Sequence, residues 1–194
     1  YQYFFELASH FRAFYLAGAL GLAILLLALK SWRWVALGVM VMTLNLGTVL
    51  PYYLPRETAN TAPNLRVLAA NVQTSNPDHT RLVSRVLEQQ PDVLVLLEVD
   101  ARWLTALEAI REHYPYAVSQ PQNDNFGIAL LSRFPFTNER IFELRPGEAP
   151  AISVQLTVSG RPVMLLAVHT LPPGSRQMAQ VRDAQLTALA DLAR

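Results

Sequence analysis

Polar side chains follow three apolar runs of the sequence at the point where each run ends. Asn71 comes after LRVLAA, Glu98 after VLVLL and His169 after VMLLAV. Each alone has an ordinary interpretation, as a turn residue, a solvated carboxylate and a satisfied core histidine. Together they offer an amide oxygen, a carboxylate and an imidazole at strand ends, where α/β scaffolds build their sites. Such a set suits magnesium, which prefers oxygen ligands and keeps several waters for phosphate substrates.

The elements that carry the first two residues follow one another as strand, helix and strand. We predict strands over 65–72 and 93–97, and the uninterrupted aliphatics of the second are typical of a strand covered on both faces. Between them Asn76 is expected to cap a helix, with Pro77 in its first position and Pro91 after its end. The apolar face of that helix is expected to consist of Leu82, Val83, Val86 and Leu87.

The rest of the globular part mixes helices with a hairpin. A strand over 126–131 and an alternating strand over 152–158 that turns back into 163–168 indicate antiparallel pairing. This combination predicts an α/β sandwich with mixed sheets flanked by helices, in contrast to a parallel doubly wound sheet. A helix over about 101–113 should bury Trp103, Leu104, Leu107 and Ile110, and one over about 175–194 should bury Met178, Val181, Leu186, Leu189 and Leu192.

The N-terminal part has a different composition. Only 6 of the 31 charged residues lie in positions 1–64, and two apolar runs predict helices over about 11–29 and 34–50. Each is close to the length that spans a hydrocarbon core of roughly 30 Å, so we predict a transmembrane hairpin over 1–55. A buried hairpin of a soluble core and a signal peptide are the alternatives. Trp32, Trp34, Tyr52 and Tyr53 would lie at the interfaces, and Asn45 is expected to join the two helices.

The cations around these helices predict an orientation. Lys30 and Arg33 lie in the expected hairpin loop, against Arg12 on one flank and Arg56 on the other. The positive-inside rule then places the loop in the cytoplasm and both ends of the hairpin outside. Residues 56–64 are polar and contain proline, which indicates a linker, so the globular part over 65–194 would face the periplasm or the exterior.

Composition excludes several kinds of chemistry. The chain has no cysteine, so it has no disulfide, thiolate zinc site or cysteine nucleophile. The globular part has 12 basic and 13 acidic residues and no lysine, whereas a nuclease groove usually clusters Lys and Arg for phosphate contacts. This balance argues against tight duplex binding and leaves lipid headgroups and small phosphodiesters beside nucleic acid as substrates.

Four segments carry a resemblance to a known family. The succession LRVLAANV, PDVLVLLEV, NFGIALLSRFP and PVMLLAVHTLPP resembles the endonuclease/exonuclease/phosphatase superfamily, and the two apolar helices before it resemble the family's bacterial membrane-anchored branch. The resemblance implies a phosphoester hydrolase in the bacterial inner membrane that uses Mg²⁺ (or Mn²⁺) and needs no obligate protein partner.

The resemblance also implies roles for single residues. Glu98 would bind the metal, Asn71 the metal or the phosphate, and His169 the scissile phosphate, while Asp124 and Asn125 would lie beside the substrate. Two arginines are left open between a structural ion pair and a phosphate contact, with the ion pair favoured: Arg133 and Arg182.

The sequence departs from the family pattern downstream. The family's later Gly-Asp-x-Asn motif and its C-terminal Asp-His pair, which complete the metal site and supply the general base, are absent. The chain is therefore expected to be a C-terminally truncated fragment that is inactive alone. A non-catalytic envelope binding module that retains the fold is the alternative function.

Overall fold

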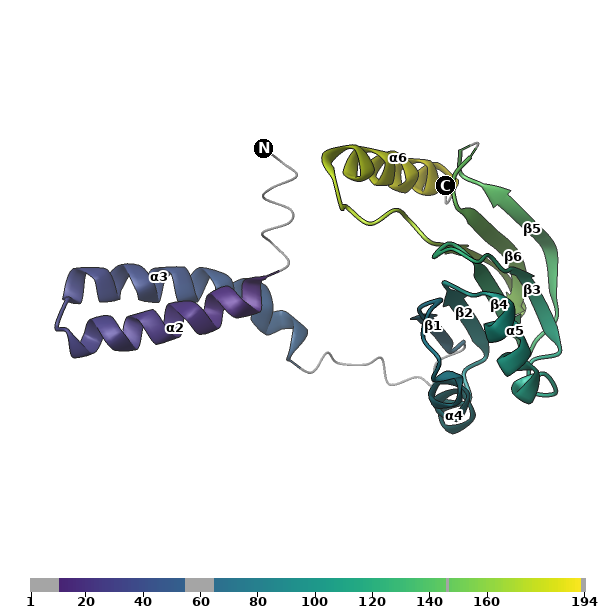
Figure 1. The fold of residues 1–194 in the computed structure, drawn as a ribbon, viewed down its shortest axis with the longest axis horizontal. Coiled ribbons are helices and arrows are strands. Elements are labelled where there is room, and N and C mark those ends of the chain that lie inside the picture. Colours follow the sequence, from purple (N-terminus) through teal and green to yellow (C-terminus); the bar gives the residue numbers. More distant parts are fainter. Residues whose placement is uncertain (1–10, 55–64, 146, 193–194) are drawn as a thin grey trace. The chain divides into compact units, whose positions relative to one another are not determined.

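The computed structural model describes residues 11–54, 65–145 and 147–192. It divides into two compact units, an N-terminal one that holds two apolar helices and a second one that holds all the described strands. The expected linker over 56–64 lies outside the described residues. Figure 1 shows the helices and strands of both units.

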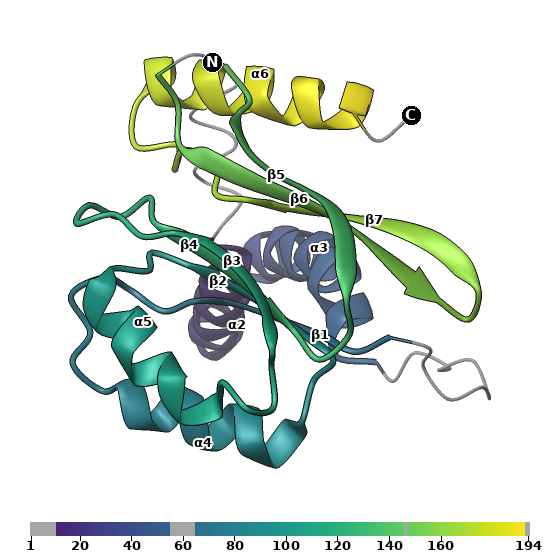
Figure 2. The same ribbon diagram turned by 90° about the vertical axis from the view of Figure 1, so that its right-hand side faces the viewer.

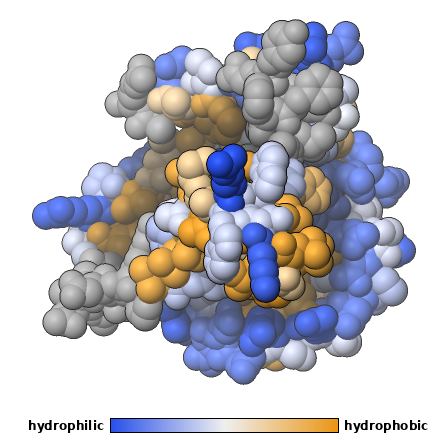
Figure 3. All heavy atoms as spheres, turned by 90° about the vertical axis from the view of Figure 1, so that its left-hand side faces the viewer, coloured by the Kyte–Doolittle hydropathy of each residue, from blue (hydrophilic) through white to orange (hydrophobic). Residues whose placement is uncertain are grey.

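The N-terminal unit is a helical hairpin, as predicted. Helix α2 (Arg12–Ala28) packs against α3 (Trp32–Val49), which continues into the 3₁₀ turn η1 (Leu50–Tyr52). Close packing is possible because a Cβ atom added at Gly38 would lie only 3.6 Å from the Cβ of Ala23. The segment Trp32–Tyr52 is 21 residues long and apolar enough to cross a membrane. Helix α2 has 17 residues, fewer than the roughly 20 that usually span a bilayer. Seen from its turn in Figure 3, the hairpin shows mostly hydrophobic side chains around a few hydrophilic ones.

The polar side chains of α3 hydrogen-bond within their own helix. Asn45 Nδ2 donates to Val41 O at 2.9 Å, and the hydroxyl groups of Thr43 and Thr48 donate to carbonyls one turn back. The bond described for Asn45 therefore supports α3 itself, and the expected bond to α2 is not among those described. Such internal bonds lower the cost of placing these groups in an apolar environment.

The second unit contains two sheets. The first is mixed, with strand order β1-β2-β4-β3, in which β1 and β2 are parallel and the other neighbours antiparallel. The second is antiparallel, with order β5-β6-β7. The predicted α/β sandwich with mixed sheets is thereby confirmed. The strands are β1 (Val67–Asn71), β2 (Val93–Leu97), β3 (Tyr116–Gln120), β4 (Ile128–Ser132), β5 (Phe136–Glu143), β6 (Pro150–Val158) and β7 (Arg161–Val168).

The sheets and helices form layers, which Figure 2 shows edge-on. Helices α4 (His79–Gln89) and α5 (Ala101–Leu107), the latter extended by η2 (Glu108–Ile110), cover the outer face of the first sheet, and the second sheet packs on its other face. Strand β2 contributes to two hydrophobic cores, one on each face of the first sheet. Leu94 and Leu96 face the helices, while Val93 and Val95 pack with Ile152 and Val154 of β6. This burial on both faces explains its run of aliphatics. Helix α6 (Arg176–Leu192) lies beyond the second sheet.

Two details of the helices differ from the predictions. Helix α4 is capped by Asp78, whose Oδ1 accepts from Arg81 N at 3.2 Å, while Asn76 closes the preceding turn by accepting from Asp78 N. Leu87 of α4 is 42% exposed. The expected inward face of α6 is confirmed only in part: Met178, Val181 and Leu189 are partly buried, whereas Leu186 and Leu192 are exposed. The buried residues of the helix are Ala179 and Gln185.

Candidate active site at the strand ends

The three strand-end residues meet at one edge of the sandwich. Strands β1 and β2 are parallel, with Asn71 opposite Leu97, so their carboxyl ends coincide. Asn71 Nδ2 donates a hydrogen bond of 2.6 Å to Glu98 Oε1, and His169 Nε2, from the second sheet, lies 3.9 Å from the same oxygen. The side chains of Glu98 and His169 are 14% and 15% exposed, so most of each side chain is buried and a small part of it reaches solvent.

Glu98 has a strained backbone. Its φ of 65° lies in the left-handed region, which costs a non-glycine residue about 1 kcal/mol or more. The Thr74 hydroxyl lies between two acceptors for its one proton, Glu98 O at 3.1 Å and Asp124 O at 3.0 Å. Strain of this kind collects at functional sites, where the surrounding structure holds a residue in an uncommon conformation.

A close backbone contact supports the segment after Glu98. Val99 N donates to Gly127 O at 3.0 Å, and Val99 O accepts from Gln122 N at 3.1 Å. A Cβ atom at position 127 would lie 1.8 Å from Val99 O. Glycine is therefore required at 127 for the 122–127 loop to lie against this segment.

Asp124 and Asn125 lie in that loop but are exposed. Asp124 Oδ1 accepts from Phe126 N at 2.9 Å and Asp124 O from the Thr74 hydroxyl at 3.0 Å. No described hydrogen bond joins either side chain to Asn71, Glu98 or His169. The structure thus places the loop beside the site and uses the Asp124 carboxylate for the turn.

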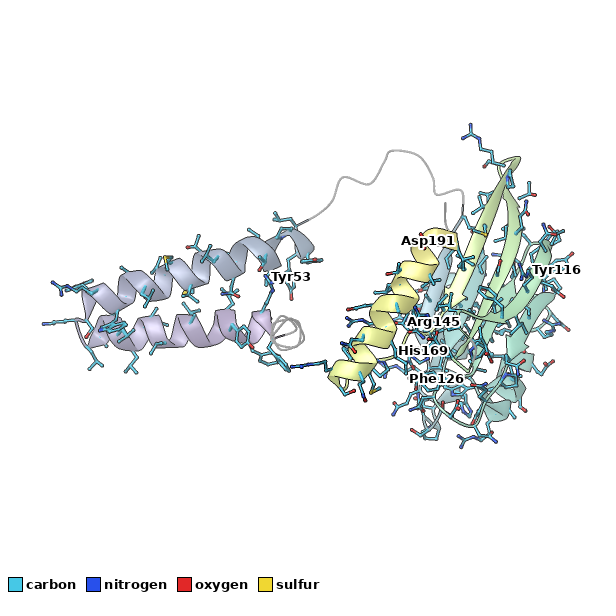
Figure 4. All side chains as sticks on the ribbon, turned by 90° about the horizontal axis from the view of Figure 1, so that it is seen from above. Tyr53, Tyr116, Phe126, Arg145, His169 and Asp191 are labelled. Atoms are coloured by element: carbon cyan, nitrogen blue, oxygen red, sulfur yellow. The ribbon has the colours of Figure 1, made fainter. Side chains whose placement is uncertain are left out.

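His169 is held by packing more than by hydrogen bonds. The ring of Phe126 lies against it, with centroids 5.5 Å apart and planes at 48° (Figure 4). Its Nδ1 is buried and has no hydrogen-bond partner among the described residues. Phe126 was not among the residues predicted for the site, although it is the second residue of the NFGIALLSR segment.

The start of α5 braces the turn that follows Asn71. Trp103 Nε1 donates to Gln73 O at 3.2 Å and Arg102 Nη2 donates to Thr74 O at 2.8 Å. Asp100 caps the helix by accepting from Trp103 N at 2.9 Å and pairs with Arg102 at 2.7 Å. Burial alone would raise the pKa of Asp100, but these hydrogen bonds and the Arg102 charge together lower that pKa below its ordinary value.

The two arginines whose role the sequence leaves open, Arg133 and Arg182, differ in their surroundings. Arg182, whose side chain is 14% exposed, pairs with Asp183 at 2.6 Å, as expected of an ion-pair residue. Arg133 is exposed, and its backbone N donates to Asp92 O at the opposite end of β2 from Glu98.

Comparison with known proteins identifies the family. The model of the Endonuclease/Exonuclease/phosphatase family matches residues 64–194. The chain belongs to this family. No curated protein shows significant sequence similarity to the chain.

Solved structures of the endonuclease/exonuclease/phosphatase family share the fold. TDP2 of D. rerio, complexed with single-strand DNA product, is 21% identical with a TM-score of 0.55, and the match covers 64% of this chain and 52% of that one. The family protein of Beutenbergia cavernae DSM 12333 is 24% identical, with a TM-score of 0.52 and coverage of 66% and 43%. The human Nocturnin catalytic domain with bound sulfate is 21% identical, with a TM-score of 0.53 and coverage of 66% and 59%. The chain thus spans about half the length of these structures.

The donor set at the strand ends fits a hydrated divalent cation. No three acidic or histidine side chains group into a cation cage among the described residues. Glu98 nevertheless offers a carboxylate that reaches solvent, and Asn71 Oδ1, which accepts from Gln73 N at 2.9 Å, adds an amide oxygen beside it. Mg²⁺ is commonly bound through one or two carboxylates, with water and substrate phosphate as the remaining ligands.

Proposed function

We propose that the complete protein is a membrane-anchored, metal-dependent phosphoester hydrolase whose site includes Asn71, Glu98 and His169. The observation that carries the proposal is the convergence of these side chains, within 2.6 and 3.9 Å of one carboxylate oxygen, from the ends of three strands. Membership of the endonuclease/exonuclease/phosphatase family and the strained backbone of Glu98 support it.

The residues divide the chemistry between them. Glu98 and Asn71 would hold Mg²⁺, or Mn²⁺, which also suits oxygen ligands. When bound, the cation neutralises charge on the phosphoryl oxygens. Asn71 orients the Glu98 carboxylate through its 2.6 Å hydrogen bond, and His169 Nε2 donates to a phosphoryl oxygen as negative charge develops there. The general base is assigned to the downstream Asp-His pair that the family pattern includes, so this chain alone is expected to be inactive.

The charge of the globular part favours some phosphoesters over others. Twelve basic residues against 13 acidic ones, with no lysine, provide little counterion release on a nucleic acid duplex. TDP2 of D. rerio was solved with a single-strand DNA product, so nucleic acid stays within the proposal. We favour a phospholipid headgroup or a small phosphodiester, with Asp124 and Asn125 at the edge of the substrate site.

The hairpin supplies the proposed anchor. We divide the protein into the hairpin over 1–55, a linker over 56–64 and the catalytic part over 65–194. Both helices would span the bacterial inner membrane with their loop in the cytoplasm, which leaves the catalytic part facing the periplasm or exterior. The support is the exposed, apolar surface of the segment Trp32–Tyr52, none of which is buried.

The proposal is tested on the complete protein purified in detergent. We expect Mg²⁺-dependent hydrolysis of a chromogenic bis-phosphodiester, plasmid DNA or a phospholipid panel. Glu98→Ala and His169→Ala should each lower the activity about a hundredfold or more. Glu88→Ala is the matched control, since Glu88 is an exposed carboxylate on α4 that pairs with Arg85. Activity that survives chelation or Glu98→Ala would refute the site, and a folded protein that hydrolyses none of these substrates would favour the binding module.

A further inference from the structure

Gln185 is a buried polar residue on a helix that is otherwise largely exposed. Its side chain is 1% exposed, and both ends of its amide are used. Oε1 accepts from Leu171 N at 3.1 Å, and Nε2 donates to Glu148 Oε2 at 3.0 Å. A buried carboxamide with both functions satisfied holds its partners in defined positions, because losing either bond would leave a desolvated polar group.

The two bonds join three segments that are distant in the sequence. Leu171 lies two residues beyond His169 in the loop after β7, and Glu148 lies in the connection between β5 and β6. Two hydrogen bonds join described residues of that connection: Glu143 Oε2 accepts from Gly147 N at 2.7 Å, and Glu148 N donates to Arg145 O at 3.1 Å. Gln185 therefore links the loop that carries His169 to Glu148, which precedes β6 in the second sheet.

Apolar packing attaches α6 only in part, because Met178, Val181 and Leu189 are partly buried. Leu186 and Leu192 are about half exposed, and the buried residues of the helix are Ala179 and Gln185. The helix lies at the outer side of the second sheet in Figures 1 and 2. The amide bridge is thus a main attachment between α6 and the loop after β7.

His169 depends on such external support. Its Nδ1 has no hydrogen-bond partner among the described residues, and its Nε2 lies 3.9 Å from Glu98 Oε1, beyond hydrogen-bond distance. The position of the ring is therefore set by the packing of Phe126 and by the backbone of its loop.

We propose that Gln185 is a positioning residue for His169. By fixing the backbone at Leu171, Gln185 holds the imidazole at the distance from Glu98 that phosphate contact needs. This inference rests on the proposed function, in which His169 touches the substrate.

The hydrogen bond between Gln185 and Glu148 can be broken and then restored with donor and acceptor exchanged. Gln185→Glu keeps an acceptor for Leu171 N but places a carboxylate against Glu148. Adding Glu148→Gln restores a hydrogen bond, now donated from position 148 to position 185. Gln180→Glu is the matched control, because Gln180 is exposed on the same helix.

The experiment uses the complete protein with [¹³Cε1]histidine and follows the His169 signal, assigned by its loss in His169→Gln. Gln185→Glu should move that signal, and should lower kcat about tenfold or more with KM changed less than about twofold. The reversed pair should return both to near the wild-type values, and Gln180→Glu should change neither. If Gln185→Glu does not fold, Gln185→Met with the same readouts takes its place.

An unmoved His169 signal in a folded Gln185 variant would overturn the inference, as would a signal that the reversed pair fails to restore. The imidazole signal requires no catalysis. If the complete protein hydrolyses nothing, the proposed function fails while the spectroscopic comparison still decides whether Gln185 positions His169.

Discussion

Glu98 keeps its strained backbone because the segment that follows it is clamped from several sides. The tightest contact is at Gly127, where a Cβ atom would meet Val99 O at 1.8 Å. We expect Gly127→Ala to lower the free energy of unfolding by about 3 kcal/mol and to disturb the Glu98 contacts. Gly160→Ala is the comparison, since Gly160 has a φ of 76° but open space around it. It should cost only about 1–2 kcal/mol.

Urea unfolding followed by circular dichroism measures both variants. A loss for Gly127→Ala no larger than that for Gly160→Ala would mean that the backbone around Val99 moves readily to make room for the Cβ atom. In that case the close approach to Val99 would not be a constraint on the site.

Asp100 gives the globular part a predicted acid sensitivity. Its pKa is lower in the folded chain, so folding favours the ionised carboxylate. That contribution is present above the ordinary value of about 4 and is lost as the pH falls through the lower folded value. Asp100→Asn keeps an acceptor for Trp103 N but removes the charge that pairs with Arg102. The variant should be less stable than wild type at pH 7, and the difference should shrink below about pH 4.

Thermal melting across this pH range provides the measurement. The control is Glu112→Gln, at an exposed position, whose small effect should not vary in this way. A pH-independent difference for Asp100→Asn would show that its charge does not contribute.

The polar ends of apolar runs were sufficient to predict that Asn71, Glu98 and His169 share one region. These three residues are recognisable in the sequence because each interrupts an otherwise aliphatic pattern. Phe126 and Gln185 are not recognisable, because an aromatic residue just before a strand and a glutamine in a helix are ordinary. Their importance depends on which distant segments they contact, and a single sequence does not contain that information.

At the scale of elements, the strands predicted from the sequence were those with an apolar run or a regular alternation of apolar and polar residues. Strand β2 and the alternating β6 are confirmed, since burial on one or both faces shapes their composition. Strands β3 (YAVSQ) and β5 (FTNERIFE) were missed because neither sequence contains a long apolar run. The inward face of α6 was assigned only in part, because the polar residue Gln185 also faces inward and a periodicity argument counts apolar residues alone.

The hairpin pairing is testable with an engineered disulfide, because the chain has no cysteine. The Cβ positions at Ala23 and Gly38 are 3.6 Å apart, within the range of about 3.5–4.5 Å that a disulfide needs. Ala23→Cys with Gly38→Cys should therefore oxidise within one chain and become protected from a polymer-tagged maleimide until it is reduced.

Ala23→Cys with Gly47→Cys is the matched control, since nothing lies within 4 Å of a Cβ atom at Gly47. Both of its thiols should stay reactive under the same oxidation. Equal protection of the two pairs would contradict the helix register.

At the scale of the whole molecule, one side of the sandwich is open in the part of the chain that the structure describes. Strands β1 and β7 end their sheets there, each with a single strand partner. Val67 on β1 is 47% exposed and Val163 on β7 is 36% exposed. Apolar side chains on unpaired edges are a liability in an isolated domain. This opening is consistent with solved relatives about twice as long as the matched part.

The orientation of the proposed membrane anchor is testable by thiol labelling. If Lys30 and Arg33 keep the hairpin loop in the cytoplasm, a thiol introduced on the globular part should be reached from outside the cell. Thr157→Cys, at an exposed position of β6, should react with a membrane-impermeant maleimide in intact spheroplasts, whereas Ser31→Cys at the hairpin turn should react only after permeabilisation.

Charge is the proposed cause, so charge removal is the control. Lys30→Gln with Arg33→Gln leaves Arg12 and Arg56 as the flanking cations and should invert or mix the labelling pattern. Labelling of Ser31→Cys before permeabilisation in the otherwise unchanged chain would place the globular part on the cytoplasmic side. The substrates would then have to be sought among cytoplasmic phosphoesters, even though the site itself would be unchanged.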